Sequence, residues 1–445
     1  MDSLVLIAYY TVMILVAVLV GPFLLLKKRA RFGMSQKLGT VPESLKQKYS
    51  ASGTTRPIWF HAVSVGEFNA ALPLLKRLHE KHPSQSIVVS STTGAGHALA
   101  KERISDFADC FYFPYDLPWC TGSWLDALNP KLVTIVETEI WPGFANQCKE
   151  RGIPISMVNA RMSPRSFKSY YKFRAFFGPV LRNFKAIGVQ SSNEFDRFKN
   201  VAGESLSVRV LGNIKFDGLQ PISVEEQNAL FAKLKIDKND KVFIAGSTHE
   251  PEESAVIAAY KQLKDKKNTK LIIAPRHPER FDKVADIIRL AGFRPRRFSQ
   301  DEKFEQEGNV YLLDAIGHLA KFYSVATVTF VGGTIAPIGG HNIVEPFTYG
   351  VPVIAGPHLH KTKDVADALL ASDALIVVQD EDELATQLES LMNNAQRRHE
   401  LGSKGEAWLH QSQGAVDRAL NLIEELALLE SKTETKIETA QGERR

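Results

Sequence analysis

The chain has 445 residues, of which 44% are hydrophobic, so it is too long for one ordinary domain and apolar enough to bury two cores. Its formal net charge of +5 is small, and it contains neither zinc-finger spacing nor a motif of interleaved aromatic and basic residues, which argues against nucleic acid as a partner. Its three cysteines, Cys110, Cys120 and Cys148, lie far apart, which disfavours a disulfide framework and a thiolate metal site.

The N-terminal segment is the strongest compositional signal. Residues 4–26 carry no charge and, as a helix, are long enough to cross a hydrocarbon core of about 30 Å. The basic run KKRAR follows at once, which is the reverse of the order in a secretory signal peptide, and the positive-inside rule then keeps the remaining chain in the cytoplasm. We expect residues 1–27 to form a membrane anchor, single-pass or monotopic because Gly21 and Pro22 allow a bent, shallow helix.

Beyond the anchor, apolar segments of strand length alternate with amphipathic segments of helix length. This pattern predicts an α/β protein whose parallel sheets are covered by helices on both faces. The expected strands are 57–63, 86–91, 132–137, 153–158 and 186–190 in the first half, and 241–246, 270–274, 309–313, 327–333 and 351–355 in the second.

The alternation is interrupted at residues 212–227, which are rich in Gly, Pro and polar residues. We therefore expect a Rossmann-like domain over residues 28–218, a second one over 219–430, and a disordered polar tail over 431–445. Each half opens with a strand, a turn of small residues and a helix that begins with Glu. Two such domains that face each other would place both turns beside a shared cleft.

A glycine-rich stretch in the second half indicates a nucleotide site. A predicted strand ends in Gly332 and Gly333, and Gly339 and Gly340 would let backbone amides approach a ligand. HNIVEPFTYG follows as a predicted helix start, which suits a phosphate, while Glu345 could accept hydrogen bonds from ribose hydroxyls. The alternative is that these residues only form turns and caps.

Further candidate groups follow other strands of the second half. Arg276, in APRHPERF, could donate to a phosphate or a base, and the alternative is that it is only a surface arginine. The segment DAIGHL offers backbone amides around Gly317. Capping by itself explains STHEPEE, residues 247–253.

Acidic side chains are few in the first half and lie at strand ends. Glu67 opens a helix in HAVSVGEF, where it could act as a base or merely complement the helix dipole. Glu137 and Glu139 end a strand in VETEIWPGF, where unpaired carboxylates are uncommon. Residues 159–177 are basic and aromatic, which suits a phosphorylated ligand, a membrane surface or a solvated helix face.

Several classes of site are disfavoured. His341 with Glu345, or His358 with His360, would need further ligands to hold zinc, and no HExxH motif or cysteine pair supplies them. Walker A and G-x-S-x-G motifs are missing from the sequence. We expect neither a metal nor another cofactor.

Taken in order, the motifs HAVSVGEF, STTGAGH, YFPYD, VETEIWP, NARMSPRS, GNIKFD, APRHPERF and GGHNIVEP resemble the 3-deoxy-D-manno-octulosonic acid (Kdo) transferases of lipopolysaccharide synthesis. The resemblance runs from the anchor to about residue 410. It implies a GT-B glycosyltransferase fold with two Rossmann-like domains around a central cleft. It also implies CMP-Kdo as donor, a lipid A precursor (lipid IVA) as acceptor, an inverting reaction, and a place at the cytoplasmic face of the cell inner membrane.

The resemblance also implies roles for single residues. Glu67 becomes the catalytic base, and Glu137 and Lys215 match positions that stabilise the transition state. The juxtamembrane segment and the charged tail depart from the family pattern. The donor-binding residues implied are Pro275, Arg276, Ile316, Gly317, His318, Asn342, Ile343, Val344 and Glu345.

Two other functions stay open at this point. One is a related GT-B enzyme that uses a UDP-sugar, or an epimerase on the same scaffold. The other is a membrane-tethered nucleotide sensor without catalytic activity. A preference for CMP over UDP would exclude the first, and a loss of activity on substitution of Glu67 would exclude the second.

Overall fold

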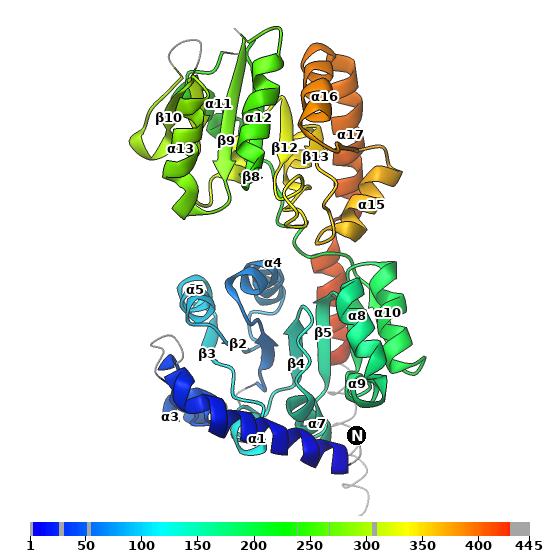
Figure 1. The fold of residues 1–445 in the computed structure, drawn as a ribbon. Coiled ribbons are helices and arrows are strands. Elements are labelled where there is room, and N and C mark those ends of the chain that lie inside the picture. Colours follow the sequence, from blue (N-terminus) through cyan, green and yellow to red (C-terminus); the bar gives the residue numbers. More distant parts are fainter. Residues whose placement is uncertain are drawn as a thin grey trace, which may run out of the picture. The chain divides into compact units, whose positions relative to one another are not determined.

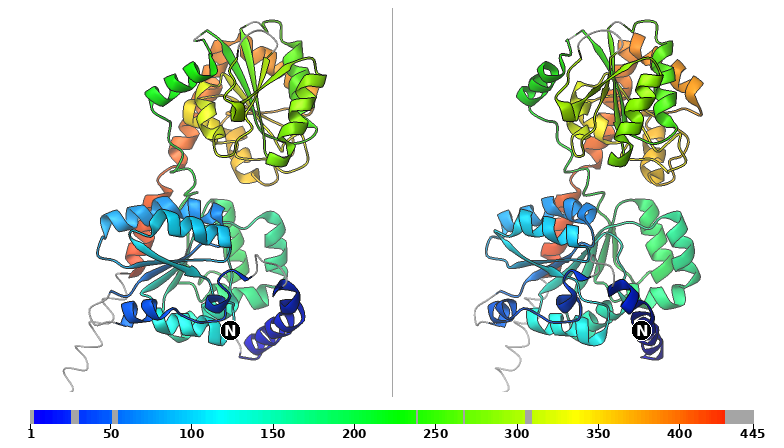
Figure 2. Two further views of the ribbon diagram at one scale, coloured as in Figure 1. Left: turned by 90° about the vertical axis from the view of Figure 1, so that its left-hand side faces the viewer. Right: turned by 60° about the vertical axis from the view of Figure 1, so that its left-hand side comes forward.

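A computed structural model describes residues 3–25, 31–50, 55–237, 239–266, 268–304 and 309–427. It divides the chain into two compact units. Unit 1 contains the residues up to Gly218 and those from Gln413 onward, and unit 2 runs from Leu219 to Ser412. Each unit is built around a seven-stranded parallel sheet with helices on both faces (Figures 1 and 2), as the alternation of apolar segments predicts.

The sheet of unit 1 has the strand order β3-β2-β1-β4-β5-β6-β7. All strands run parallel, but β2 and β3 are added on one side of β1 and the strands from β4 onward on its other side. The boundary between β1 and β4 is therefore a topological switch point, and open parallel sheets bind ligands in the crevice at such a point. The strands are β1 Ile58–His61, β2 Ile87–Ser91, β3 Ala108–Tyr112, β4 Leu132–Val136, β5 Ile155–Ala160, β6 Ala186–Val189 and β7 Val208–Val210.

Both faces of this sheet are buried, since apolar side chains alternate to the two sides of β1 and β4 and meet helices on each. The helices with bounds are α1 Ser3–Leu25, α2 Met34–Lys37, α3 Glu43–Ser50, α4 Val65–Lys81, α5 Gly94–Ile104, α6 Pro118–Leu128, α7 Pro142–Glu150, α8 Pro164–Lys172, α9 Arg174–Leu181 and α10 Ser192–Ala202.

The end of the described chain corrects the domain prediction. Residues 415–427 form a helix that belongs to unit 1, whereas the sequence predicts one continuous second domain over residues 219–430. Apolar side chains of this helix, among them Leu420 and Ile423, are buried in the core that β1 and α4 share. The chain therefore returns to unit 1 because that core needs these side chains.

Unit 2 has the strand order β10-β11-β9-β8-β12-β13-β14. The topological switch point of its sheet also lies next to its first strand, between β8 and β12. Its strands are β8 Lys241–Thr248, β9 Thr269–Pro275, β10 Arg294–Arg297, β11 Asn309–Leu312, β12 Val328–Val331, β13 Val353–Ala355 and β14 Leu375–Val377. Its α-helices are α11 Val224–Leu234, α12 Glu252–Gln262, α13 Phe281–Leu290, α14 Leu319–Phe322, α15 Lys363–Ala371, α16 Glu381–Asn393 and α17 Ala395–Ser412. Short 3₁₀ turns are η2 Pro278–Arg280, η3 Phe298–Gln300, η4 Tyr323–Val325 and η5 Glu345–Tyr349.

The ten predicted strands are confirmed, and the strands that the sequence analysis missed lie towards the sheet edges. β7 and β14 have only three residues each, β3 carries Asp109, and the edge strand β10 is the polar run Arg-Pro-Arg-Arg. A search for apolar segments does not detect such strands because an edge position tolerates polar and charged side chains.

The N-terminal segment forms helix α1, which packs against unit 1. The Tyr9 hydroxyl donates to an oxygen of Asp116 at 2.7 Å, and Asp116 also accepts from the backbone N–H groups of Gly143 and Phe144 at the start of α7. Within the part of the chain that the structure describes, no helix is long and apolar enough to cross a membrane. Lys27, Lys28 and Arg29 of the basic run and the predicted tail 431–445 lie outside the described residues.

Candidate active site

Glu67 lies beside the topological switch point of the unit 1 sheet. β1 ends at His61 and α4 begins at Val65, with Ser64 as its N-cap in extended conformation. The Ser64 hydroxyl accepts from the Glu67 N–H at 3.4 Å, so Glu67 occupies the third residue of the helix. The small residues of the VSVG turn thus allow one carboxylate to stand at the carboxyl end of β1.

The same local contacts fix the orientation of the Glu67 carboxylate. The Val63 N–H donates to Oε2 at 2.6 Å and the Ser64 hydroxyl donates to Oε1 at 3.3 Å. Burial raises the pKa of Glu67, the Val63 hydrogen bond lowers it, the charge of Glu137 raises it, and Lys215 lowers it. Glu67 does complement the helix start, but its half-buried carboxyl also belongs to a charged cluster.

Glu137 and Lys215, which are far apart in sequence, form an ion pair. Lys215 Nζ lies 2.6 Å from Glu137 Oε1. Glu137 directly follows β4, the neighbour of β1, and has a φ of 64° although it is not glycine. Such a conformation costs of the order of 1 to 3 kcal/mol and is concentrated at functional sites. The unit therefore accepts backbone strain where it places this carboxylate.

Asn159 holds the segment that carries Lys215. It lies in β5, has a φ of 56°, and its side-chain oxygen accepts from the Ile214 N–H at 3.2 Å. The Lys215 N–H donates to the Asn213 side chain at 3.0 Å. The motifs NARMSPRS and GNIKFD thus meet at the carboxyl edge of the sheet, where they direct the Lys215 side chain to Glu137.

Glu139 is a member of this cluster that the sequence analysis noticed but did not assign to the site. Its pKa is raised to about 7 by burial and then by the charges of Glu67 and Glu137. The signal was present in the sequence, because VETE places two carboxylates two residues apart after a buried strand. We name Glu67, Glu137, Glu139 and Lys215 the acidic cluster.

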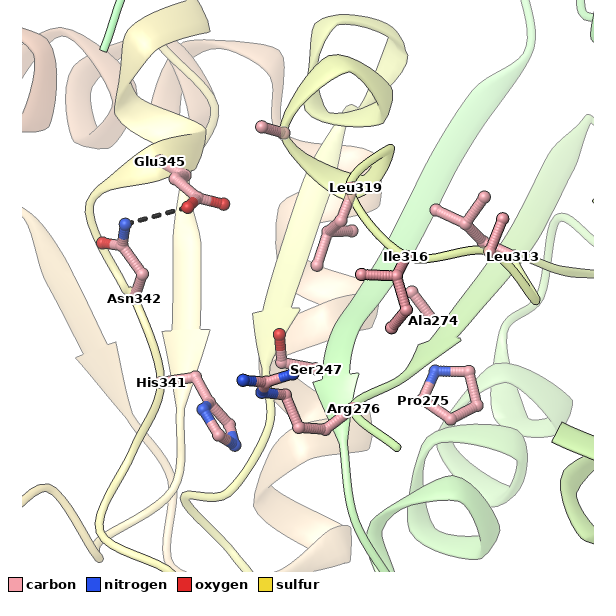
Figure 3. Close-up of a pocket in the computed structure, with 13 residues that line it drawn as sticks. Ser247, Ala274, Pro275, Arg276, Leu313, Ile316, Leu319, His341, Asn342 and Glu345 are labelled. Atoms are coloured by element: carbon pink, nitrogen blue, oxygen red, sulfur yellow. Dashed lines mark hydrogen bonds between the residues drawn. The ribbon is translucent and has the colours of Figure 1, made fainter. Parts of the chain in front are cut away.

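Unit 2 contains a pocket of about 340 Å³ at the carboxyl ends of its strands (Figure 3). Leu313, Ile316 and Leu319 form an apolar wall, and His341, Asn342 and Glu345 lie across the pocket from them. The full lining is Ser247, Ala274, Pro275, Arg276, Leu313, Ala315, Ile316, Gly317, Leu319, Ala320, His341, Asn342 and Glu345. One apolar and one polar wall suit a ligand with a flat base and a hydroxylated, charged remainder.

The structure brings most, but not all, of the predicted donor-binding residues to this pocket. Its lining includes Pro275, Arg276, Ile316, Gly317, Asn342 and Glu345. His318 is not in the lining, and its ring packs on Phe298 with centroids 4.8 Å apart. Ile343 and Val344 are buried in the core, so their side chains do not line the pocket.

The glycine-rich loop corrects the predicted amide cradle. Its amides are already used inside the protein: the N–H groups of Gly339 and Gly340 both donate to the Gly333 carbonyl, at 3.0 and 2.7 Å. Those of Gly333 and Thr334 donate to the carboxylate of Glu252, at 2.8 Å each. A ligand phosphate would therefore have to displace these bonds before it could use the amides.

Glu252 is the organising residue of this loop. Its fully buried carboxylate accepts from five backbone N–H groups, and the sequence analysis explained its segment by capping alone. The donors are His249, Gly333, Thr334, Ile335 and Ala336, at 2.8 to 3.1 Å. A carboxylate is suited to this position because successive N–H groups form an anion-binding concavity.

The predicted helix after the glycines is also different in the structure. Residues 341–344 have no regular helix, and Glu345–Tyr349 form a short 3₁₀ helix. Pro346 follows Glu345 directly, and an α-helix rarely continues through such a position. The predicted dipole of an α-helix is therefore missing from this segment, and side chains must supply the charge for any phosphate.

Asn342 and Glu345 form a hydrogen-bonded pair on the polar wall. The Asn342 amide donates to Glu345 Oε1 at 2.9 Å, and burial raises the pKa of Glu345, which this bond opposes (Figure 3). Ser247 and His341 complete this wall, although neither was assigned to the site from the sequence. Ser247 lies at the carboxyl end of β8, and His341 lies in the loop after β12.

Known proteins place the chain in a family. Residues 29–218 match the family described as 3-deoxy-D-manno-octulosonic-acid transferase (kdotransferase), and residues 226–408 match glycosyl transferases group 1. The 3-deoxy-D-manno-octulosonic acid transferase of Haemophilus influenzae is 31% identical over 402 residues, which cover 88% of this chain and 93% of that protein. The corresponding transferase of Rickettsia felis is 30% identical, with coverage of 89% and 85%.

Solved structures show the fold. HepE of Anabaena in complex with UDP-glucose has a TM-score of 0.56 at 16% identity and covers 84% of this chain and 99% of its own. The UDP-GlcNAc 2-epimerase of Neisseria meningitidis has a TM-score of 0.57 at 14% identity, with coverage of 84% and 99%. Two parallel-sheet units and these neighbours support the GT-B fold. Since a relative at 31% identity spans nearly the whole chain, the protein is a glycosyltransferase that belongs to the 3-deoxy-D-manno-octulosonic acid transferase family.

Proposed function

We propose that this protein transfers Kdo from CMP-Kdo to a lipid A precursor such as lipid IVA, with inversion at the anomeric carbon. Relatives that are named Kdo transferases match this chain over most of their length. The observation that carries the chemical part of the proposal is the acidic cluster, because it combines an oriented carboxylate with a second carboxylate paired to a lysine.

Glu67 is the general base in this mechanism. A sugar hydroxyl is a weak nucleophile, and a carboxylate that accepts its proton as the new bond forms raises its reactivity. The Val63 and Ser64 hydrogen bonds hold the carboxylate in one orientation, so little reorganisation is needed during the reaction. Because attack and departure occur in one displacement, no covalent enzyme intermediate is required.

Glu137 and Lys215 stabilise charge in the transition state. The carboxylate of Glu137 favours the positive charge that develops on the sugar ring, and the ammonium group of Lys215 favours the negative charge of the departing phosphate. Their ion pair at 2.6 Å holds both groups in place before substrate binds. Such preorganised charges lose little free energy to solvent reorientation.

The pocket of unit 2 is the proposed CMP-Kdo site. Its apolar wall accommodates the cytosine ring, and Glu345 and Asn342 offer hydrogen bonds to ribose hydroxyls. Among the described residues, no acceptor contacts the N–H groups of Ile316 and Gly317, so both remain able to bind the base edge. His318, Ile343 and Val344 contribute through backbone or packing.

The acceptor is lipidic, so we also propose that unit 1 associates with the cytoplasmic face of the inner membrane. Helix α1 exposes apolar side chains, including Val12, Val18 and Leu19 at 57%, 65% and 67%. The amphipathic helix α8 adds Arg165, Lys168 and Lys172 for anionic headgroups. Co-sedimentation of wild type with anionic phospholipid vesicles, and its loss in Leu19→Glu, would support this association. Equal sedimentation of the variant and wild type would contradict it.

The decisive experiment follows CMP release from CMP-Kdo with and without lipid IVA, for wild type and Glu67→Gln. We expect CMP release from wild type to depend on the acceptor. Glu67→Gln should still bind the donor but release CMP about 10²-fold to 10⁴-fold more slowly. The anomeric configuration of the product, read by NMR, tests inversion. Near-normal transfer by Glu67→Gln would exclude Glu67 as the base. Turnover of a UDP-sugar instead of CMP-Kdo would exclude CMP-Kdo as the donor.

A further inference from the structure

A histidine pair beside the pocket has no role in the mechanism above. His249 Nε2 and His341 Nε2 lie 2.7 Å apart, which is a hydrogen-bond distance, and the two rings are nearly coplanar, with an angle of 4° between them. His341 lines the pocket, and the guanidinium of Arg276 points towards its side of the pocket (Figure 3). Since two neutral imidazoles share one proton between these nitrogens, one ring donates and the other accepts.

The pair is built by the loop that Glu252 organises. The carboxylate of Glu252 binds the His249 N–H and the N–H groups of residues 333–336, so it ties the end of β8 to the loop after β12. The His341 ring then lies against Gly333, where an added Cβ would come within 2.8 Å of ring atom Cδ2. Gly333 has a φ of 69°, so this position favours glycine for two reasons.

The surroundings of the pair are predominantly cationic. The pKa of His341 is lowered to about 4, first by burial and then by His249, Arg276, Lys361 and His277. Burial, His277 and Arg280 lower the pKa of His249, whereas the carboxylates of Glu252 and Glu253 raise it. Without an anion, both rings are therefore held neutral at pH 7.

The cation-rich side of the pocket needs an anionic ligand, and the loop amides cannot supply the contact because they are bonded internally. We propose that the His249–His341 pair contacts a phosphate oxygen of the bound nucleotide and takes up one proton when the nucleotide binds. This inference rests on the proposed function, since it assigns the phosphate of a cytidine nucleotide to this pocket.

The proton balance is simple. In the empty pocket the pair holds two ring protons, one of them shared between the Nε2 atoms. The phosphate charge offsets the charges of Arg276 and Lys361, so a third proton from solvent binds to the pair and turns it into a hydrogen-bonded imidazole and imidazolium. The imidazolium donates to the phosphate oxygen. During transfer, the same charge would stabilise the CMP that departs.

Calorimetric titration of the full-length protein with CMP tests this proposal. The titrations are made at pH 7.5 in three buffers that differ in ionisation enthalpy, and the slope of observed heat against that enthalpy counts the protons taken up. We expect an uptake that approaches about one proton per CMP in wild type, and a Kd that rises by up to about tenfold per pH unit above pH 7.5.

Two variants assign the proton. His341→Gln and His249→Gln each keep a polar side chain of similar reach that cannot take up a proton, so each should bind CMP more weakly and without the proton uptake. His399→Gln is the matched control, since His399 is an exposed histidine on α17 of the same unit. Far-UV circular dichroism and thermal melting confirm that each variant is folded.

The outcomes separate this inference from the proposed function. CMP binding to wild type without proton uptake, or with an uptake that both variants retain, would overturn the inference and leave the donor assignment intact. Failure of folded wild type to bind CMP at all would overturn the donor assignment and the inference together.

Discussion

Glu252→Gln provides the sharpest test of how unit 2 is held together. The carboxylate is fully buried and accepts from three N–H groups through Oε1 and from two, those of His249 and Gly333, through Oε2. Glutamine retains one acceptor oxygen of the same reach. Its NH₂ group would then face two backbone donors and bind neither.

The magnitude follows from those two contacts. A hydrogen bond to a charged group contributes about 1.5 to 3 kcal/mol, and a buried donor left unbonded costs a comparable amount. Two lost bonds, reduced by local relaxation, predict a loss of roughly 3 kcal/mol. For a unit of this size, that corresponds to a fall in Tm of roughly 6 to 12 °C.

Differential scanning calorimetry of the full chain measures this loss as a shift in the unfolding transition of unit 2. Glu400→Gln is the control, because Glu400 is exposed on α17 and bonds only to the Gln396 side chain at 3.0 Å among the described residues. A fall in Tm no greater than that of the control would refute the reasoning. CMP binding should weaken in Glu252→Gln, since the loop that positions His249 loses two of its ties.

Three further predictions concern the two sites. Lys215→Met should raise the pKa of Glu67, because the ammonium group that lowers it is lost, so the acid limb of kcat/KM should move to higher pH; an unshifted limb would contradict this. Glu139 has a pKa of about 7 against an ordinary 4.5, so the folded protein binds the extra proton and its stability falls as pH rises through that window. Glu139→Gln should therefore gain stability relative to wild type between pH 5 and pH 8 in urea unfolding, and a pH-independent difference would exclude the assignment. Gly333→Ala should weaken CMP binding at least about tenfold, because its Cβ meets the His341 ring at 2.8 Å and its φ is 69°; unchanged Kd by calorimetry would show that the ring moves aside freely.

The sequence was sufficient for the architecture because parallel sheets leave a strong periodic signal. Strands buried on both faces are continuous apolar runs, so the sequence alone locates β1, β4, β8 and β12. It does not locate β10, since an edge strand of arginines has no such pattern. The return of residues 415–427 to unit 1 was also missed, because an apolar helix does not state which core it completes.

The candidate site divides in the same way. Motifs at strand ends identified Glu67, Glu137 and Arg276, since the carboxyl edge of a parallel sheet collects such residues whatever their separation along the chain. The prediction for the glycine-rich loop was wrong because a sequence shows which amides could bind an anion, but not which of them already bind an anionic side chain of the protein. In this fold Glu252, eighty-one residues before Gly333, supplies that anion.

By itself, therefore, the sequence determined the fold class, the family and the residue types at the strand ends. Local periodicity and short motifs encode these properties, and they do not depend on distant contacts. Only the tertiary structure decided the partners: Lys215 with Glu137, His249 with His341, and Glu252 with the loop after β12. Charges and hydrogen bonds act over a few ångströms, so which groups share a proton or an ion pair is settled when the strands align and the loops close over their ends.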